Sequence, residues 1–179
     1  MKPIIIIGVV VLLIILIWIY MKYNTTVPSD VYFVTDPSSF TGKPVYIRNK
    51  ATGKYLSSYG DSPQASTLVA MLPVKRDTWI LTPTTASANS YSIQAGSDTK
   101  LYGFGSNVTK LLYYCSQCPS LSYIIEPVDS TGASFRFKYT NSPGYYGITV
   151  NAPDTNGNTL PAYKDYDPKD LSQIWELVK

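Results

Sequence analysis

Two kinds of apolar residue pair recur three times along residues 44–179 of the chain. The two members of each pair lie two positions apart, which is the period of a strand with one buried face. Successive copies of the first pair lie 46 and 44 residues apart, and copies of the second pair lie 44 and 52 residues apart. The first pairs are Val45/Ile47, Tyr91/Ile93 and Phe135/Phe137, and the second pairs are Trp79/Leu81, Tyr123/Ile125 and Trp175/Leu177.

A repeat of about 45 residues with four short strands per unit predicts an all-β domain with the β-trefoil fold. No unit can bury its apolar face alone, so we expect the three units to pack around a pseudo-threefold axis and the twelve residues to form one core. Turn-forming sequences at intervals of about 8 to 12 residues support the short strands. Extra residues between Asp154 and Lys169 explain the longer third unit. The alternative is chance periodicity in a β protein of another architecture.

The N-terminal residues 1–22 have a different character, that of a membrane anchor. Eighteen consecutive residues from Ile4 to Met21 carry no charge, and fourteen of them are Ile, Leu or Val. As a helix this stretch covers about 27 Å, close to the ~30 Å hydrocarbon core of a bilayer. Trp18 and Tyr20 lie at its end, where an aromatic belt is expected. We therefore predict one transmembrane helix before the trefoil, a single-pass membrane location and the lipid bilayer as a partner.

A cleaved signal peptide and a buried core helix are the alternatives for this segment. A signal peptide has a shorter apolar stretch and a small-x-small cleavage site, which the sequence around Tyr20–Asn24 lacks. A soluble core helix without a polar face over eighteen residues would be unusual. Residues 23–43 read as a polar linker or stalk, in which Val31–Val34 is a short apolar run that could form a strand against the domain.

Composition excludes several classes of function. The chain contains no histidine, which removes Ser-His-Asp and Cys-His catalysis and most zinc sites. No carboxylate pair recurs at positions that suggest acid–base chemistry, so we expect no enzyme, no metal and no cofactor. The net charge of +3 is spread over single lysines, and this argues against nucleic acid as a partner.

The third unit resembles a ricin B-type repeat. Tyr146–Asn151 and Asn156–Leu160 resemble its hairpins, and Gln173-Ile174-Trp175 resembles its Q-x-W signature. The first unit has Asp77-Thr78-Trp79 at the signature and Gly53-Lys54-Tyr55-Leu56 like the family's G-K-x-L hairpin, and the second has a degenerate Leu121-Ser122-Tyr123. The likeness covers residues 44–179, and other trefoils such as fascin share several of these short motifs.

The resemblance implies where a sugar would bind. Lectins of this family use an Asp after the second strand's leucine, where this chain has Ser57, Tyr102 and Thr149. They also use an aromatic platform after the third strand, which corresponds here to Tyr163 and to Tyr113 or Tyr114. A packing role competes with the platform role for these tyrosines. Asp165 and Asp167 could replace the missing carboxylate, although the sequence alone does not place them in the pocket.

Two short motifs stand apart from the repeat. Cys115 and Cys118 form a C-x-x-C without further soft ligands, which predicts a loop with either a disulfide or two free thiols. Asn107 begins an N-x-[ST] sequon in a glycine-rich loop and is a candidate for glycosylation, whereas Asn24 lies too close to the predicted membrane.

Two functional hypotheses follow. The first is a membrane-anchored structural protein, such as a minor virion component, whose trefoil binds neighbouring proteins of a capsid or membrane complex. The second is a membrane-bound lectin that binds glycans. The missing sugar-site carboxylates favour the first.

Overall fold

The computed structural model describes residues 12–16, 27–60, 64–98, 100–106, 111–116, 121–141, 144–153, 155 and 157–179. Residues 12–16, inside the predicted span, are helical with exposed side chains. Within these described parts, no helix is long and apolar enough to cross a membrane. The predicted span therefore stays a prediction, and its named residues Ile4, Trp18, Tyr20 and Met21 lie outside the described residues.

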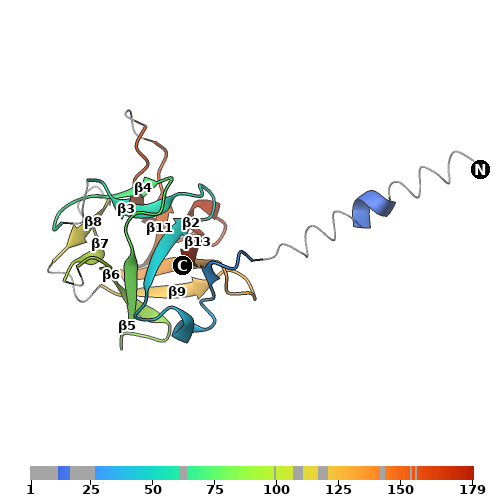
Figure 1. The fold of residues 1–179 in the computed structure, drawn as a ribbon, viewed down its shortest axis with the longest axis horizontal. Helices are drawn as coiled ribbons and strands as arrows, with labels where there is room; N and C mark the ends of the chain where they lie inside the picture. Colours follow the sequence, from blue (N-terminus) through green and yellow to red (C-terminus); the bar gives the residue numbers. More distant parts are fainter. Residues whose placement is uncertain are drawn as a thin grey trace, which may run out of the picture.

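Twelve strands follow one another in three sets of four (Figure 1). The strands are short and are joined by turns, as the turn signals in the sequence predict. The first set is β2 (Pro44–Asn49), β3 (Tyr55–Ser58), β4 (Val69–Leu72) and β5 (Trp79–Pro83); the second is β6 (Ser90–Ala95), β7 (Tyr102–Ser106), β8 (Leu112–Cys115) and β9 (Tyr123–Pro127); the third is β10 (Phe135–Asn141), β11 (Gly144–Val150), β12 (Pro161–Asp165) and β13 (Trp175–Val178).

The first and fourth strands of each set form a closed antiparallel ring. Neighbours pair in the order β2–β5–β6–β9–β10–β13, and β13 returns to β2 with Leu177 opposite Ile47. Closure leaves these six strands without an open edge along the pairing. The predicted threefold repeat therefore corresponds to a six-stranded barrel, with two strands from each unit.

The second and third strands of each set form three hairpins that meet one another. β3 pairs with β4, β7 with β8 and β11 with β12. Leu68 bridges to Tyr113, Leu111 bridges to Ala162, and the amide of Met71 donates to the oxygen of Thr159 at 2.9 Å. Each hairpin is thus joined to the next, which repeats the same contact around the pseudo-threefold axis.

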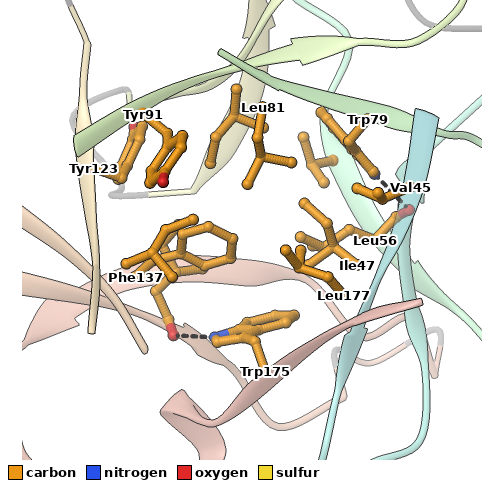
Figure 2. Close-up of a cluster of buried hydrophobic side chains, with 14 of the residues drawn as sticks. Val45, Ile47, Leu56, Trp79, Leu81, Tyr91, Tyr123, Phe137, Trp175 and Leu177 are labelled. Carbon is orange, nitrogen blue, oxygen red and sulfur yellow. Dashed lines mark hydrogen bonds between the residues drawn. The ribbon is translucent and has the colours of Figure 1, made fainter. Parts of the chain in front are cut away.

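One apolar cluster fills the barrel (Figure 2). Each predicted core residue is at most 4% exposed, because the period-two pairs place both members on the inner face. Phe135 and Phe137 pack edge to face with ring centres 4.9 Å apart. The twelve are Val45, Ile47, Trp79, Leu81, Tyr91, Ile93, Tyr123, Ile125, Phe135, Phe137, Trp175 and Leu177.

Residues 27–43, which belong to the predicted linker or stalk at residues 23–43, pack against the trefoil. β1 (Val31–Tyr32) pairs with β13, as the apolar run suggests, and Val31 is 3% exposed. After the 3-10 helix η1 (Pro37–Ser39), Phe40 is fully buried with its ring 5.7 Å from that of Tyr91. The polar residues of this segment form turns around buried anchors, which a composition-based reading takes for a linker.

Candidate functional site

The residue two positions before each closing tryptophan organises a polar cluster at the edge of the barrel. In the first unit this residue is Asp77, next to Trp79, whose indole N–H donates to the main-chain oxygen of Leu56 at 3.1 Å. In the third unit it is Gln173, which precedes Trp175 by the same spacing. Both positions correspond to the first residue of the Q-x-W signature that carries the family resemblance.

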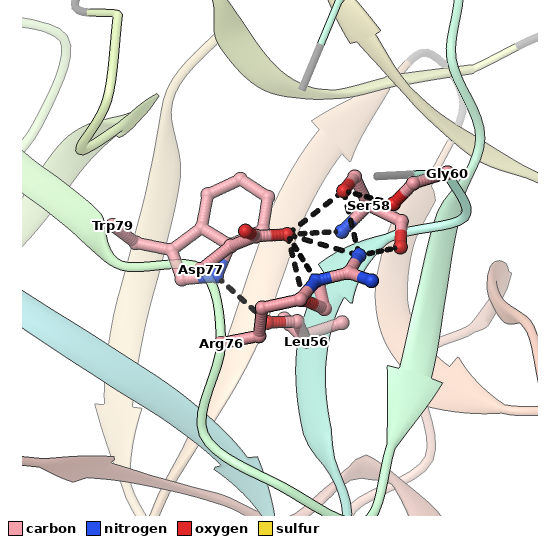
Figure 3. A network of polar contacts seen from close by, with 7 residues as sticks. Leu56, Ser58, Gly60, Arg76, Asp77 and Trp79 are labelled. Atoms are coloured by element: carbon pink, nitrogen blue, oxygen red, sulfur yellow. Dashed lines mark hydrogen bonds and ion pairs between the residues drawn. The ribbon is translucent and has the colours of Figure 1, made fainter. Parts of the chain in front are cut away.

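Asp77 accepts a set of hydrogen bonds through one carboxylate oxygen (Figure 3). Its Oδ2 receives Ser57 Oγ at 2.6 Å, the Ser58 amide at 2.6 Å and Ser58 Oγ at 2.9 Å. Arg76 Nη2 lies 3.3 Å from the same oxygen and also donates to Ser58 Oγ. The hydroxyl of Ser57, at the position where a sugar-site aspartate was expected, is thus bonded to the carboxylate of Asp77.

Electrostatics keep this carboxylate charged. Burial alone would raise the pKa of Asp77, but the hydrogen bonds from Ser57 and Ser58 and the charge of Arg76 outweigh it and hold the pKa below its usual value. The hydroxyl of Tyr114 is buried nearby with no hydrogen-bond partner among the described residues. Burial and the charge of Asp77 raise the pKa of Tyr114 and keep this hydroxyl neutral.

The third unit uses an amide where the first uses a carboxylate. Gln173 Nε2 donates to the main-chain oxygen of Asp165 at 3.0 Å, and its Oε1 accepts the Asp167 amide at 3.3 Å. Gly147 lies directly against this amide, because a Cβ at position 147 would be 2.2 Å from Gln173 Oε1. Thr149 is 3% exposed and its hydroxyl bonds Ser172. The Gln173 amide therefore holds the chain in place at Asp165 and Asp167. The sugar position of this unit is the buried Thr149, which is not acidic.

Tyr163 is not a sugar platform, which corrects that expectation. Its side chain is 8% exposed and belongs to the core, where its ring stacks on Tyr123 with centres 6.4 Å apart and the two hydroxyls form a hydrogen bond. Burial raises the pKa of both tyrosines. Tyr163 packs in the core because β12 directs its side chain towards the interior. Tyr113, on β8, is half-buried.

No protein-family model matches the chain, and no curated protein matches it. Solved structures do match. The designed threefold-symmetric protein ThreeFoil has a TM-score of 0.60 at 13% identity, over 76% of this chain and 98% of that chain. The BEL β-trefoil has a TM-score of 0.58 at 14% identity, over 77% and 93%. A ricin B-like lectin from Macrolepiota procera, solved with lactose, has a TM-score of 0.58 at 15% identity, over 78% and 96%.

The fold is a β-trefoil. All three structures are covered almost completely, and the barrel and hairpins described above provide the same three-unit arrangement. At these identities the likeness establishes the fold, so the function of this trefoil has to be argued from its own residues.

A partly exposed cluster of two tyrosines, a lysine and a glutamate lies where the second and third units of the trefoil adjoin, and the sequence analysis did not predict it. Lys138 Nζ lies 4.3 Å from the ring centre of Tyr145 and 4.7 Å from that of Tyr166. Glu126 accepts a hydrogen bond from the Tyr166 hydroxyl and lies 3.7 Å from Lys138 Nζ. Tyr145 is 50% exposed. Strand pairing brings Glu126 of β9, Lys138 of β10 and Tyr145 of β11 together, and the Tyr166 amide donates to the main-chain oxygen of Tyr145 at 3.1 Å.

Two hollows flank the N-terminal segment where it enters the trefoil. One, of about 420 Å³, is lined by residues that include Tyr32, Phe33, Lys43 and Lys179. The other, of about 280 Å³, is lined by residues that include Lys50, Asp129 and Glu176. Val27 and Pro28 belong to both linings, so the entering chain forms a wall between them.

The remaining predicted residues have separate outcomes. Cys115 is disulfide-bonded, in agreement with one of the two alternatives for the C-x-x-C, but its predicted partner Cys118 lies outside the described residues. Asn107 also lies outside them, as do the side chains of Tyr102 and its neighbours. Asp165 is exposed on β12, and Asp167 caps its own turn by accepting the Lys169 amide at 2.8 Å. Since Tyr163 is buried, neither aspartate completes a sugar pocket with it.

Proposed function

We propose that the chain is a membrane-tethered binding module, not an enzyme, whose N-terminal helix holds the β-trefoil at a bilayer surface for contact with a neighbouring capsid or membrane-complex protein. The observation that carries the proposal is the packing of the N-terminal segment against the barrel. Val31 pairs with Val178 on β13, and Phe40 is fully buried. A chain that leaves the membrane near residue 22 is then joined to the barrel at Val31, nine residues later.

The proposed partner surface is the aromatic cluster of Tyr145, Tyr166, Lys138 and Glu126. Tyrosine is enriched at protein interfaces because its ring offers contact area at a small entropic cost and its hydroxyl can hydrogen-bond. The half-exposed ring of Tyr145 already contacts Lys138, so binding would cost little further side-chain entropy at this residue.

Alkaline carbonate extraction of full-length chain from membranes tests the tether. The unmodified chain is expected in the membrane pellet, because its span contributes about −4 to −8 kcal/mol at most to insertion. Leu13→Lys with Leu16→Lys costs about 6 to 8 kcal/mol and should move the chain to the soluble fraction. Leu13→Ile with Leu16→Ile is the matched control and should stay in the pellet. An unmodified chain that is released at alkaline pH, or a mature N-terminus after Tyr23, would refute the tether.

Cross-linking mass spectrometry on the native membrane or particle tests the partner. We expect recurrent cross-links from Lys138 or Lys164 to one neighbouring protein. Tyr145→Ala should weaken that contact at least tenfold, as expected for a hot-spot tyrosine. Tyr59→Ala is the control, since Tyr59 is also 50% exposed but belongs to the first unit. Equal loss in both variants, or none in either, would argue against this surface.

Carbohydrate binding is the second candidate, and the same cluster favours it. A sugar can stack its C–H face on the exposed Tyr145 ring, and Glu126 and Lys138 offer an acceptor and a donor for its hydroxyls. The Macrolepiota procera lectin, solved with lactose, has this fold. Glycan-array binding that Tyr145→Ala abolishes and Tyr59→Ala preserves would support this candidate. A partner contact that free sugars leave unchanged would support the first.

A further inference from the structure

The larger hollow beside the N-terminal segment is basic. Among the described residues that line its volume of about 420 Å³, the only charged side chains are Lys43 and Lys179. Phe33, also in the lining, is 41% exposed. An apolar ring beside two ammonium groups is the combination found where a protein contacts the surface of a membrane.

Both ammonium groups keep donors for a ligand. Lys43 Nζ donates to the main-chain oxygen of Ser39 at 2.9 Å. Lys179 Nζ donates to that of Ser29 at 3.3 Å and lies 5.3 Å from the ring centre of Tyr32. The ion pairs of the described residues include neither lysine, and the nearby Asp30 is paired with Lys75 at 3.5 Å. Because an ammonium has three N–H donors, each lysine can still bind an anionic oxygen.

Chain length places this hollow close to the proposed bilayer. Six peptide links separate Met21, the last residue of the predicted span, from Val27 in the lining. Their full extension is about 22 Å, so Val27 lies at most this far from the end of the predicted span, and a bent link brings the hollow to the headgroup layer. The smaller hollow across Val27 contains Asp129 and Glu176, whose charges oppose binding of an anion.

We propose that Lys43 and Lys179 bind the phosphate of an anionic phospholipid in the adjacent leaflet, while Phe33 contacts the interface. The proposal deepens the membrane-tethered function and rests on it. Bound lipid would fix the orientation of the trefoil on the bilayer and so direct its partner surface.

Full-length chain in nanodiscs, with an environment-sensitive fluorophore on Ser38→Cys beside the hollow, provides the test. Nanodiscs of phosphatidylcholine alone are compared with nanodiscs that contain about 30 mol % phosphatidylglycerol. We expect emission to rise about twofold with the anionic lipid and the rise to fall with added salt. Lys43→Gln with Lys179→Gln should abolish the rise. Lys100→Gln with Lys169→Gln, which removes the same charge from exposed lysines outside the hollow, should preserve it.

Each outcome decides the proposal. A rise that both double variants lose equally indicates general charge attraction and rejects the hollow, provided that urea unfolding gives the same midpoint for both. A rise produced by inorganic phosphate in lipid-free detergent reassigns the site to the free ion and also rejects it. A chain that inserts into the nanodiscs but does not respond to anionic lipid rejects the headgroup site alone. A chain that fails to insert rejects the tether and the site together.

Discussion

The indole N–H of Trp175 donates a hydrogen bond to the main-chain oxygen of Ile148 at 2.9 Å. Trp79 repeats this contact with Leu56 in the first unit at 3.1 Å. Both tryptophans are fully buried, so each hydrogen bond satisfies a carbonyl that water cannot reach. The closing tryptophan therefore ties the barrel to the second strand of its own unit.

Trp175→Phe tests this tie. We expect the free energy of unfolding to fall by about 2 to 4 kcal/mol, because the change leaves a buried carbonyl unpaired and opens a cavity. Urea unfolding measures the loss as a lower midpoint with an unchanged slope. Tyr59→Phe, at a half-exposed position, is the control and should cost less than about 0.5 kcal/mol. A midpoint for Trp175→Phe that equals that of the control would contradict the tie.

The lowered pKa of Asp77 predicts that the folded chain loses stability in acid. Its pKa is lower in the folded chain than its usual value of 3.8, so its contribution is complete above that value and disappears as the pH falls through the folded pKa. At pH 7, Asp77→Asn should lower the free energy of unfolding by about 1 to 3 kcal/mol. The difference between variant and parent should shrink as the pH falls from about 5 towards 2.

Urea unfolding over this pH range, with Asp129→Asn as the control, measures the effect of Asp77. Asp129 caps an exposed turn through one oxygen, and an amide oxygen can accept the same bonds, so its variant should change little at any pH. A difference for Asp77→Asn that stays constant down to pH 2 would show that the carboxylate is not stabilised by its network.

Gly147 predicts a steric effect on the Gln173 amide. Gly147→Ala should cost about 1 to 3 kcal/mol, because the new Cβ would lie 2.2 Å from Gln173 Oε1 and the amide would lose its bonds to Asp165 and Asp167. Gly144→Ala, where a Cβ meets nothing within 4 Å, is the matched control on the same strand. Because the clash needs the amide, Gly147→Ala in a Gln173→Ala background should cost much less than alone. Additive costs would rule out this mechanism.

The sequence predicted the elements that repeat, and it failed where a feature occurs once. Period-two pairs such as Phe135 and Phe137 determine which face is buried, so the core could be assigned before the fold was known. The direction of a single side chain could not, and the sequence therefore left both a platform role and a packing role open for Tyr163, which lies in the core. Asp77 was visible in Asp77-Thr78-Trp79, but its partners Ser57 and Ser58 come from another strand.

The aromatic cluster and the basic hollow, on which the proposals rest, could not be predicted because residues far apart in the sequence form them. Tyr145 and Glu126 both approach Lys138 because β10 lies between their strands, and Lys43 and Lys179 line one hollow because the first and last segments of the domain adjoin. Glu126 and Tyr145 are 19 residues apart in the sequence and Lys43 and Lys179 are 136 apart, so no short window contains either pair. An alignment of the three repeats could have found these two residue pairs only if the strand order of the barrel was already known.

Phe40 and Phe33 provide the sharpest test of where the domain begins. Phe40 is fully buried against Tyr91, whereas Phe33 is 41% exposed. Phe40→Ala should lower the free energy of unfolding by about 3 to 5 kcal/mol through lost burial and the cavity it leaves. Phe33→Ala should cost less than about 0.5 kcal/mol, since water already reaches its ring. Urea unfolding of both variants in the full-length chain gives the comparison, and equal midpoints would mean that residues before 44 do not contribute to the core.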